Sequence, residues 1–82
     1  MWYAFTMDYG VAACKTKREV VSAIQTGFTS RIKKMDKGSY LYQHKEDDGF
    51  WYDKYYIFGS KSLAIKNGFC DQLKEFEEEK YV

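Results

Sequence analysis

Aromatic side chains crowd one short stretch of the chain and leave few folds open to it. Eight of the nineteen residues from Tyr40 to Phe58 are aromatic, and the sequence Asp47-Asp48-Gly49 interrupts them. Acidic residues followed by glycine are typical of the turn of a β-hairpin. Since alternate side chains of a strand point to opposite faces, a hairpin this aromatic shows rings on both faces. We therefore predict a hairpin whose second face must be covered or must bind something.

The two strands of this hairpin are predicted over Ser39–Lys45 and Phe50–Phe58. A connecting loop of two or four residues gives the same pairing parity. One face would then hold Tyr40, Tyr42, His44, Trp51, Asp53, Tyr55 and Ile57. The opposite face would hold Leu41, Gln43, Lys45, Phe50, Tyr52, Lys54, Tyr56 and Phe58. A three-residue loop with a glycine bulge would shift the register by one residue, and both faces would still be aromatic.

The segment before the hairpin predicts a strand and a helix. Alternation from Trp2 to Tyr9 indicates a strand that ends at Gly10, with one side facing the core: Tyr3, Phe5, Met7 and Tyr9. Thr16 and Glu19 have the spacing of a capping box, which starts a helix. Apolar residues at helical spacing, ending in Ile32 and Met35, predict one helix over about 17 to 37. The competing interpretation stops the helix at Gly27 and makes Phe28 to Met35 a strand.

The segment after the hairpin predicts a further helix. Ser60 or Ser62 can cap it, and its apolar stripe is Ile65, Phe69, Leu73 and Phe76. The Asn67-Gly68 pair can break it into a short turn and a longer helix. The expected order is thus β-α-β-β-α in a single domain over residues 1–82. It is a small two-layer α+β domain, in which an antiparallel three-stranded sheet packs on two helices.

Charge is divided unevenly along the chain. The formal net charge is only +1, but residues 1–45 carry eight basic side chains against three acidic ones. Residues 46–82 carry five basic side chains against nine acidic ones, including Glu77, Glu78 and Glu79 near the end. A near-neutral total speaks against a domain dedicated to nucleic acid, since such domains are usually clearly basic.

The sequence contains no arrangement of residues that predicts catalysis or a cofactor. Phosphate-binding loops, paired cysteines and the common hydrolase motifs are missing, so we expect a protein that is not an enzyme and needs no cofactor or metal. His44 could form a general base with Asp53 across the hairpin, but we interpret it as a surface histidine on a strand. Cys14 and Cys70 are interpreted as reduced thiols, with one long-range disulfide as the alternative.

Binding to another protein explains the exposed rings best. We predict Tyr40, Tyr42, Trp51 and Tyr55 as anchors, because tyrosine and tryptophan supply large contact area at low entropic cost. Glu77, Glu78 and Glu79 would meet a basic patch on the partner, which could be a host protein that binds nucleic acid. One alternative is single-stranded nucleic acid stacked on the aromatic sheet face beside a basic helix. The other is a homodimer in which the ring-rich face pairs with itself.

In its overall character the chain resembles the small inhibitors that phages encode against host machinery, including anti-CRISPR and anti-restriction proteins. It is short, begins at once with a strand, is rich in lysine and tyrosine, and has no proline and no catalytic set. The resemblance implies a protein that acts by covering a surface of its target. No stretch approaches the roughly 18 apolar residues of a membrane span, and the start does not look like a signal peptide. We therefore expect no membrane partner and a cytoplasmic location, in the host if the protein is phage-encoded.

Overall fold

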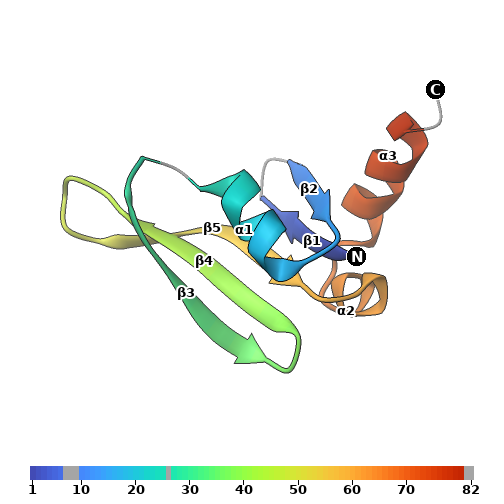
Figure 1. Ribbon diagram of the computed structural model, residues 1–82, viewed down its shortest axis with the longest axis horizontal. Helices are drawn as coiled ribbons and strands as arrows, with labels where there is room; N and C mark the ends of the chain where they lie inside the picture. Colours follow the sequence, from blue (N-terminus) through green and yellow to red (C-terminus); the bar gives the residue numbers. More distant parts are fainter. Residues whose placement is uncertain (7–9, 26, 81–82) are drawn as a thin grey trace.

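The computed structural model describes residues 1–6, 10–25 and 27–80, and it shows a mixed β and α structure (Figure 1). Within these residues, five strands and three helices follow one another: β1 (Trp2–Phe5), β2 (Val11–Cys14), α1 (Lys17–Ile24), β3 (Thr29–Asp36), β4 (Ser39–Lys45), β5 (Trp51–Phe58), α2 (Lys61–Lys66) and α3 (Cys70–Lys80). Met7 and Tyr9, predicted to face the core, lie outside the described residues.

All five strands belong to one antiparallel sheet with the order β2-β1-β5-β4-β3. The predicted three-stranded sheet on two helices is therefore wrong, because β2 and β3 extend it at its two edges. The run Val11–Cys14 is too short to show an alternating pattern, yet it pairs with all four residues of β1. A short strand of this kind forms because a hairpin partner satisfies its backbone.

The predicted helix over 17 to 37 is also wrong beyond its first two turns. The capping box forms as expected, since the Thr16 hydroxyl accepts a hydrogen bond from the Glu19 amide at 3.1 Å. The helix then ends at Ile24, before Gly27, and the competing interpretation of a following strand is confirmed by β3. Ile32 and Met35 belong to the predicted apolar stripe but are 38% and 60% exposed. Pairing with β4 therefore outweighs the local helical spacing.

Helix α1 packs on one side of the sheet, which we name the α1 face. Val20 and Ile24 of the helix are buried against Ala4, Tyr42 and Ile57. Trp2, Tyr40 and Tyr55 pack around this cluster and complete its aromatic wall. Full burial of an aliphatic or aromatic side chain contributes about 1.5–3 kcal/mol relative to exposure, so this cluster holds the helix to the sheet.

Helices α2 and α3 pack on the opposite side, which we name the α2/α3 face. Phe5 and Phe58 of the sheet are buried there with Ala64 and Leu73 of the helices. The break predicted at Asn67-Gly68 is confirmed, and Ser60 caps α2 through a hydrogen bond from the Leu63 amide. Helices thus cover both faces of the sheet, where the predicted two-layer fold had them on one.

Among the described residues, no helix is long and apolar enough to cross a bilayer.

The pairing of β4 with β5 changes register halfway along the hairpin. Tyr42 lies opposite Tyr55, but the next residue, Gln43, lies opposite Asp53, so Lys54 is an extra residue in a β-bulge. Near the helices the pairing has the parity predicted for a loop of two or four residues. Toward the loop the parity is shifted by one, because a bulge reverses which face the following side chains occupy.

The turn between β3 and β4 lies against α2, and substitution of its glycine tests this contact. Gly38 and Gly49 both have a positive φ, of 77° and 82°. A Cβ atom at Gly38 would lie 2.8 Å from Leu63 Cδ1, whereas nothing lies within 4 Å of one at Gly49. Backbone strain alone predicts that Gly49→Ala lowers the free energy of unfolding by about 1 kcal/mol. Gly38→Ala should lower it by about 2 kcal/mol, because Leu63 must also move.

Urea denaturation of both variants and the parent protein measures this difference. The Gly49→Ala variant is the matched control, since it carries the same backbone strain without the contact. Equal destabilisation of the two variants would contradict a tight contact between this turn and α2.

Candidate functional site

Three of the four predicted aromatic anchors lie on the α1 face and belong to its packing. Tyr42 is 1% exposed, and its ring meets the edge of Tyr55 at a centroid distance of 6.0 Å. Tyr40 lies 6.1 Å from Trp2, and Lys17 Nζ of α1 sits 3.8 Å from the centroid of the Tyr40 ring. Tyr40 and Tyr55 are half-buried. The structure therefore places these rings together, but as part of the core cluster and its border.

Trp51, the fourth predicted anchor, lies on the opposite face of the sheet. It pairs with Lys45 on the shifted side of the bulge, so the structure does not bring it together with the three tyrosines. The acidic residues predicted as a second contact lie in α3, away from the β4–β5 loop (Figure 1). Glu77 forms an ion pair with Lys61, and Glu78 is exposed. The side chain of Glu79 is outside the part that the structure describes.

A row of polar side chains crosses β3, β4 and β5 beside Trp51. Arg31 Nε donates to Gln43 Oε1 at 2.8 Å, and Gln43 Nε2 donates to Asp53 Oδ1 at 2.6 Å. The Arg31 guanidinium carbon also lies 4.1 Å from the centroid of the Trp51 ring. A cation placed over tryptophan in this way is attracted by the ring electrons. The row therefore holds Trp51 and Arg31 in one fixed, half-exposed arrangement.

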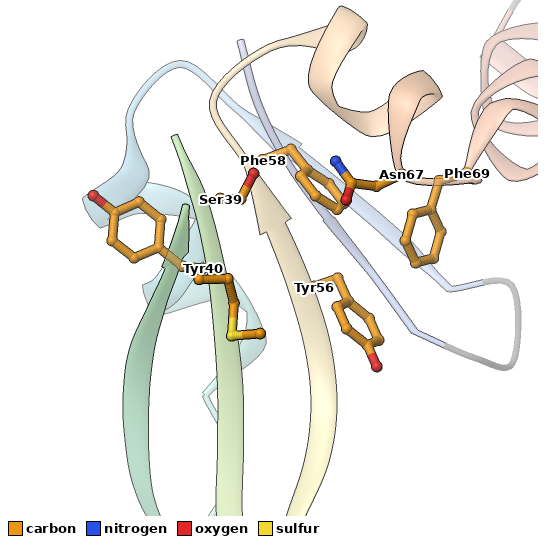
Figure 2. A pocket seen from close by; sticks show the side chains of 7 residues that line it. Ser39, Tyr40, Tyr56, Phe58, Asn67 and Phe69 are labelled. Atoms are coloured by element: carbon orange, nitrogen blue, oxygen red, sulfur yellow. The ribbon is translucent and has the colours of Figure 1, made fainter. Parts of the chain in front are cut away.

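A pocket of about 310 Å³ lies on the same face, closer to the helices (Figure 2). It lies between the sheet and the junction of α2 with α3, and its lining is Met35, Ser39, Tyr40, Tyr56, Phe58, Asn67 and Phe69. Phe69 packs against Tyr56 and Phe58 at ring distances of 5.5 Å. In Figure 2 the ring of Tyr40 lies on the other side of β4 from these rings, so it does not enter the pocket. A mostly apolar hollow with a hydroxyl and an amide at its border fits an apolar side chain.

The pocket and the polar row together form one surface, which we name the open face. It consists of the exposed or half-buried side chains on the α2/α3 side of β3, β4 and β5, closed at one end by the helix junction: Arg31, Lys33, Met35, Lys45, Trp51, Tyr56 and Phe69. Helices α2 and α3 pack mainly on β1, β2 and β5 and leave this area uncovered. Arginine, methionine and aromatic residues are the types enriched in protein interfaces.

A second group of exposed rings lies in and beside the loop between β4 and β5. Phe28 and Phe50 are 47% and 68% exposed, and Tyr52 is 38% exposed. The loop is acidic, and Glu46, Asp47 and Asp48 line a shallow hollow together with Phe28. The Tyr52 hydroxyl donates a hydrogen bond to Asp48 Oδ2, while Asp48 Oδ1 accepts from the Phe50 amide at 2.9 Å. The Asp48 carboxylate therefore holds the β4–β5 loop in place through these two hydrogen bonds.

His44 is buried and does not meet Asp53. It is 4% exposed, so its interpretation as a surface histidine is wrong. It lies on the α1 side of β4, whereas Asp53 bonds to Gln43 on the other side. Its ring lies tilted against that of Phe28 at a centroid distance of 4.5 Å, and its Nε2 atom lies 3.3 Å from Glu46 Oε1. The pair proposed for general base catalysis is therefore not formed.

The described residues also contain no group of three or more histidine, cysteine or acidic side chains placed to hold a metal ion. Cys14 and Cys70 are free thiols and both are half-buried. Cys14 packs at the border of the core cluster on the α1 face. Its position is that of a small apolar residue.

No protein-family model matches the chain, no curated protein is significantly similar to it in sequence, and no solved structure matches it significantly in fold. The function must therefore be argued from the surfaces that the fold leaves exposed.

Sequence reasoning missed most of the open face. The apolar spacing favours a helix through Arg31 and Met35, and the competing strand interpretation does not say which strand they pair with, so the sequence does not place them beside Trp51 and Tyr56. Met35 is the extra residue of a second bulge, between Lys34 and Asp36, which the sequence does not mark. Phe69 was predicted as part of an apolar helical stripe. Its position just after the Asn67-Gly68 break was the available signal that its ring borders a helix junction.

The hydrogen bond between Asp48 and Tyr52, beside the β4–β5 loop, shifts the pKa values of the two groups in opposite directions. It raises the pKa of the Tyr52 hydroxyl and lowers the pKa of the Asp48 carboxyl. The bond needs an ionised Asp48 and a protonated Tyr52. It is therefore lost as pH falls through the lowered pKa of Asp48, and again as pH rises through the raised pKa of Tyr52. Asp48→Asn should lower the pKa of Tyr52 toward its ordinary value.

NMR of tyrosine labelled with ¹³C at Cζ follows this titration at alkaline pH. Asp47→Asn is the matched control, because it removes a neighbouring charge that makes no bond to Tyr52. If both variants move the Tyr52 titration equally, the hydrogen bond is not the cause of the shift.

Proposed function

We propose that the protein is a non-enzymatic binding module that covers a surface of another protein in the cytoplasm, in the manner of the small inhibitors that phages encode. The open face is the contact surface in this proposal. The observation that carries it is the placement of the Trp51–Arg31 pair on the same uncovered sheet face as the pocket beside Phe69. Tryptophan, tyrosine and arginine dominate the binding energy of protein interfaces.

The pocket defines the chemistry of the partner at one end of the open face. Phe58 and the Phe69 ring form apolar walls, and Met35, which is 60% exposed, stands at the border. An apolar side chain of the partner would displace water from these walls. Burial of apolar surface contributes about 25 cal/mol per Å², so one large side chain supplies on the order of 2 kcal/mol.

At the other end of the open face, positive charge defines the chemistry of the partner. Arg31, Lys33 and Lys45 stand on the open face, and Asp53 is already bonded to Gln43. Acidic groups on the partner would meet this excess of positive charge, and such complementarity mainly increases the association rate and the specificity. The surface that we propose includes Trp51 of the predicted anchors. It includes neither the three tyrosines of the α1 face nor Glu77, Glu78 and Glu79.

One observation favours a second candidate function. The same three basic residues stand on one sheet face with Trp51 and Tyr56, which is the combination that single-stranded nucleic acid uses for phosphates and bases. Asp36 and Asp53 interrupt this face, and the net charge of the chain is only +1. We therefore place this function second.

Substitution of Met35 tests the first proposal without disturbing a packed side chain. Met35→Glu puts a charge at the pocket and should reduce partner binding at least tenfold, which corresponds to about 1.4 kcal/mol. Trp51→Ala should reduce it by a similar or larger factor, as expected of a central aromatic anchor. The measurement is capture from a lysate of the host, with the captured proteins quantified by mass spectrometry.

Ile65→Glu is the matched control, since Ile65 is also an exposed apolar residue, 45% exposed on α2, and does not line the pocket. Thermal unfolding of each variant verifies that the fold is intact. Capture of the same proteins at parental levels by both Met35→Glu and Trp51→Ala would show that the open face is not the contact surface. Light scattering at two concentrations reports a homodimer, the remaining alternative.

The nucleic-acid candidate predicts a fluorescence change on titration with oligo(dT) or oligo(U). Binding should weaken steeply between about 50 and 200 mM salt, because phosphate contacts release counterions. Lys33→Glu should weaken it further, whereas Lys74→Glu, which changes an exposed lysine of α3, serves as the control. Absence of binding at the lower salt concentration removes this candidate.

A further inference from the structure

Strand β3 forms a long free edge of the sheet. In the described part of the chain it pairs with β4 alone, and all eight of its residues are exposed. The opposite edge, β2, is four residues long and half-buried. An edge strand carries a row of backbone N–H and C=O groups that have no partner in the sheet. The edge at β3 is therefore the place where a further strand can be added.

The charge of this edge selects the strand that can join it. Arg31, Lys33 and Lys34 are basic, and the one acidic residue, Asp36, accepts a hydrogen bond from the Lys37 amide at 2.8 Å. A second copy of β3 in antiparallel pairing would bring basic side chains against basic side chains, which is destabilising. An acidic strand would instead find opposite charge along the middle of the edge, at Arg31, Lys33 and Lys34.

A groove runs beside this edge on the α1 face. It has a volume of about 580 Å³ and is lined by α1 and β3 through Lys17, Arg18, Val21, Ser22, Gln25 and Ile32. Val21 is half-buried and Ile32 is 38% exposed, so they form an apolar strip. Lys17 and Arg18 stand at the start of the helix, where the helix dipole adds to their positive charge.

The groove and the edge fit the same occupant. A strand added along β3 would direct every second side chain toward the α1 face, where the groove lies, and the others toward the open face. Lys34 lies opposite Tyr40 in the sheet and so faces the groove side, as Ile32 does. Acidic and apolar side chains could therefore both be accommodated beside α1.

We propose that β3 takes up an extended acidic segment of another protein as a sixth strand, whose side chains on the α1 face lie in the groove between α1 and β3. Main-chain hydrogen bonds hold such a strand, and the groove selects its side chains. The inference rests on the proposed function in one respect only, that the partner is a protein. It involves β3 and α1, and does not require Trp51 or the pocket beside Phe69.

A synthetic peptide tests this directly. The probe is a fluorescent eight-residue peptide that alternates glutamate with valine or threonine, and anisotropy measures its binding to the full chain. Hydrogen exchange should slow at amides within 29–36 when the peptide is present, because added backbone bonds protect them. The same peptide with every backbone nitrogen methylated keeps its charge but has no amide donor for the hydrogen-bond ladder on either edge, and it should not bind.

Charge reversal at the groove and at the neighbouring β3 edge provides a second test. The double substitution Arg18→Glu and Lys34→Glu should weaken peptide binding at least tenfold. The matched control is Lys66→Glu with Lys74→Glu, which changes the same number of exposed lysine or arginine residues away from the groove. This control should bind the peptide like the parent protein.

Several results would overturn the proposal. They are equal binding of the N-methylated peptide, unchanged exchange within 29–36, and a concentration-dependent dimer whose formation alone protects these amides. Protection of the same amides by oligo(dT) in place of the peptide would also overturn it, in favour of nucleic acid. If the peptide fails while Trp51→Ala, which changes β5 and not the β3 edge, still abolishes capture of the partner, strand addition is wrong and the open face stands as the contact surface. If the peptide binds while Trp51→Ala has no effect on capture, strand addition stands and the open face is not the contact surface.

Discussion

The shortage of helical residues is the constraint on which the rest of this structure depends. Five strands at a spacing of about 4.8 Å make a sheet roughly 20 Å wide, and one helix with its side chains covers about 10 Å. Helix α1 has eight residues and packs on one face, while α2 and α3, with six and eleven, share the other. They bury the sheet around β1 and the end of β5 and leave β3 uncovered. The part of the sheet beyond the helices, β3 above all, must therefore be held by strand pairing and by its own side chains.

Two single-residue bulges decide what this uncovered half displays. Without the extra residue Lys54, Trp51 would share the α1 face with Tyr42 and Tyr55. With it, Trp51 stands beside Arg31 and the Gln43–Asp53 hydrogen bond. The extra residue Met35 stands in the same way at the border of the apolar pocket. The composition of the open face thus comes from two local irregularities of the ladder more than from the alternation of the strands.

The parts of the fold that local chemistry determines could be predicted from the sequence. The aromatic hairpin, the Thr16 cap, the Ser60 cap and the break at Asn67-Gly68 each depend on residues that are neighbours in the chain. Strand β3 could not be predicted with the same certainty, because Ile32 and Met35 have helical spacing and the exposed strand has no apolar face. Its conformation is imposed by β4, which is a tertiary effect. The open face was missed for the same reason, since Arg31 and Met35 reach it only through that pairing and its bulges.

The absence of β3 side chains from both core clusters has an evolutionary consequence. Substitutions at buried positions of a domain this small remove a large fraction of its stability, which restricts how such positions change. The exposed side chains of β3 are released from that restriction, because exposed substitutions usually alter stability by less than about 0.5 kcal/mol. The edge can therefore diversify in charge and shape while the helices and the inner strands stay constant. For the proposed binding function, this means that the contact surface can change while the buried residues that stabilise the fold stay the same.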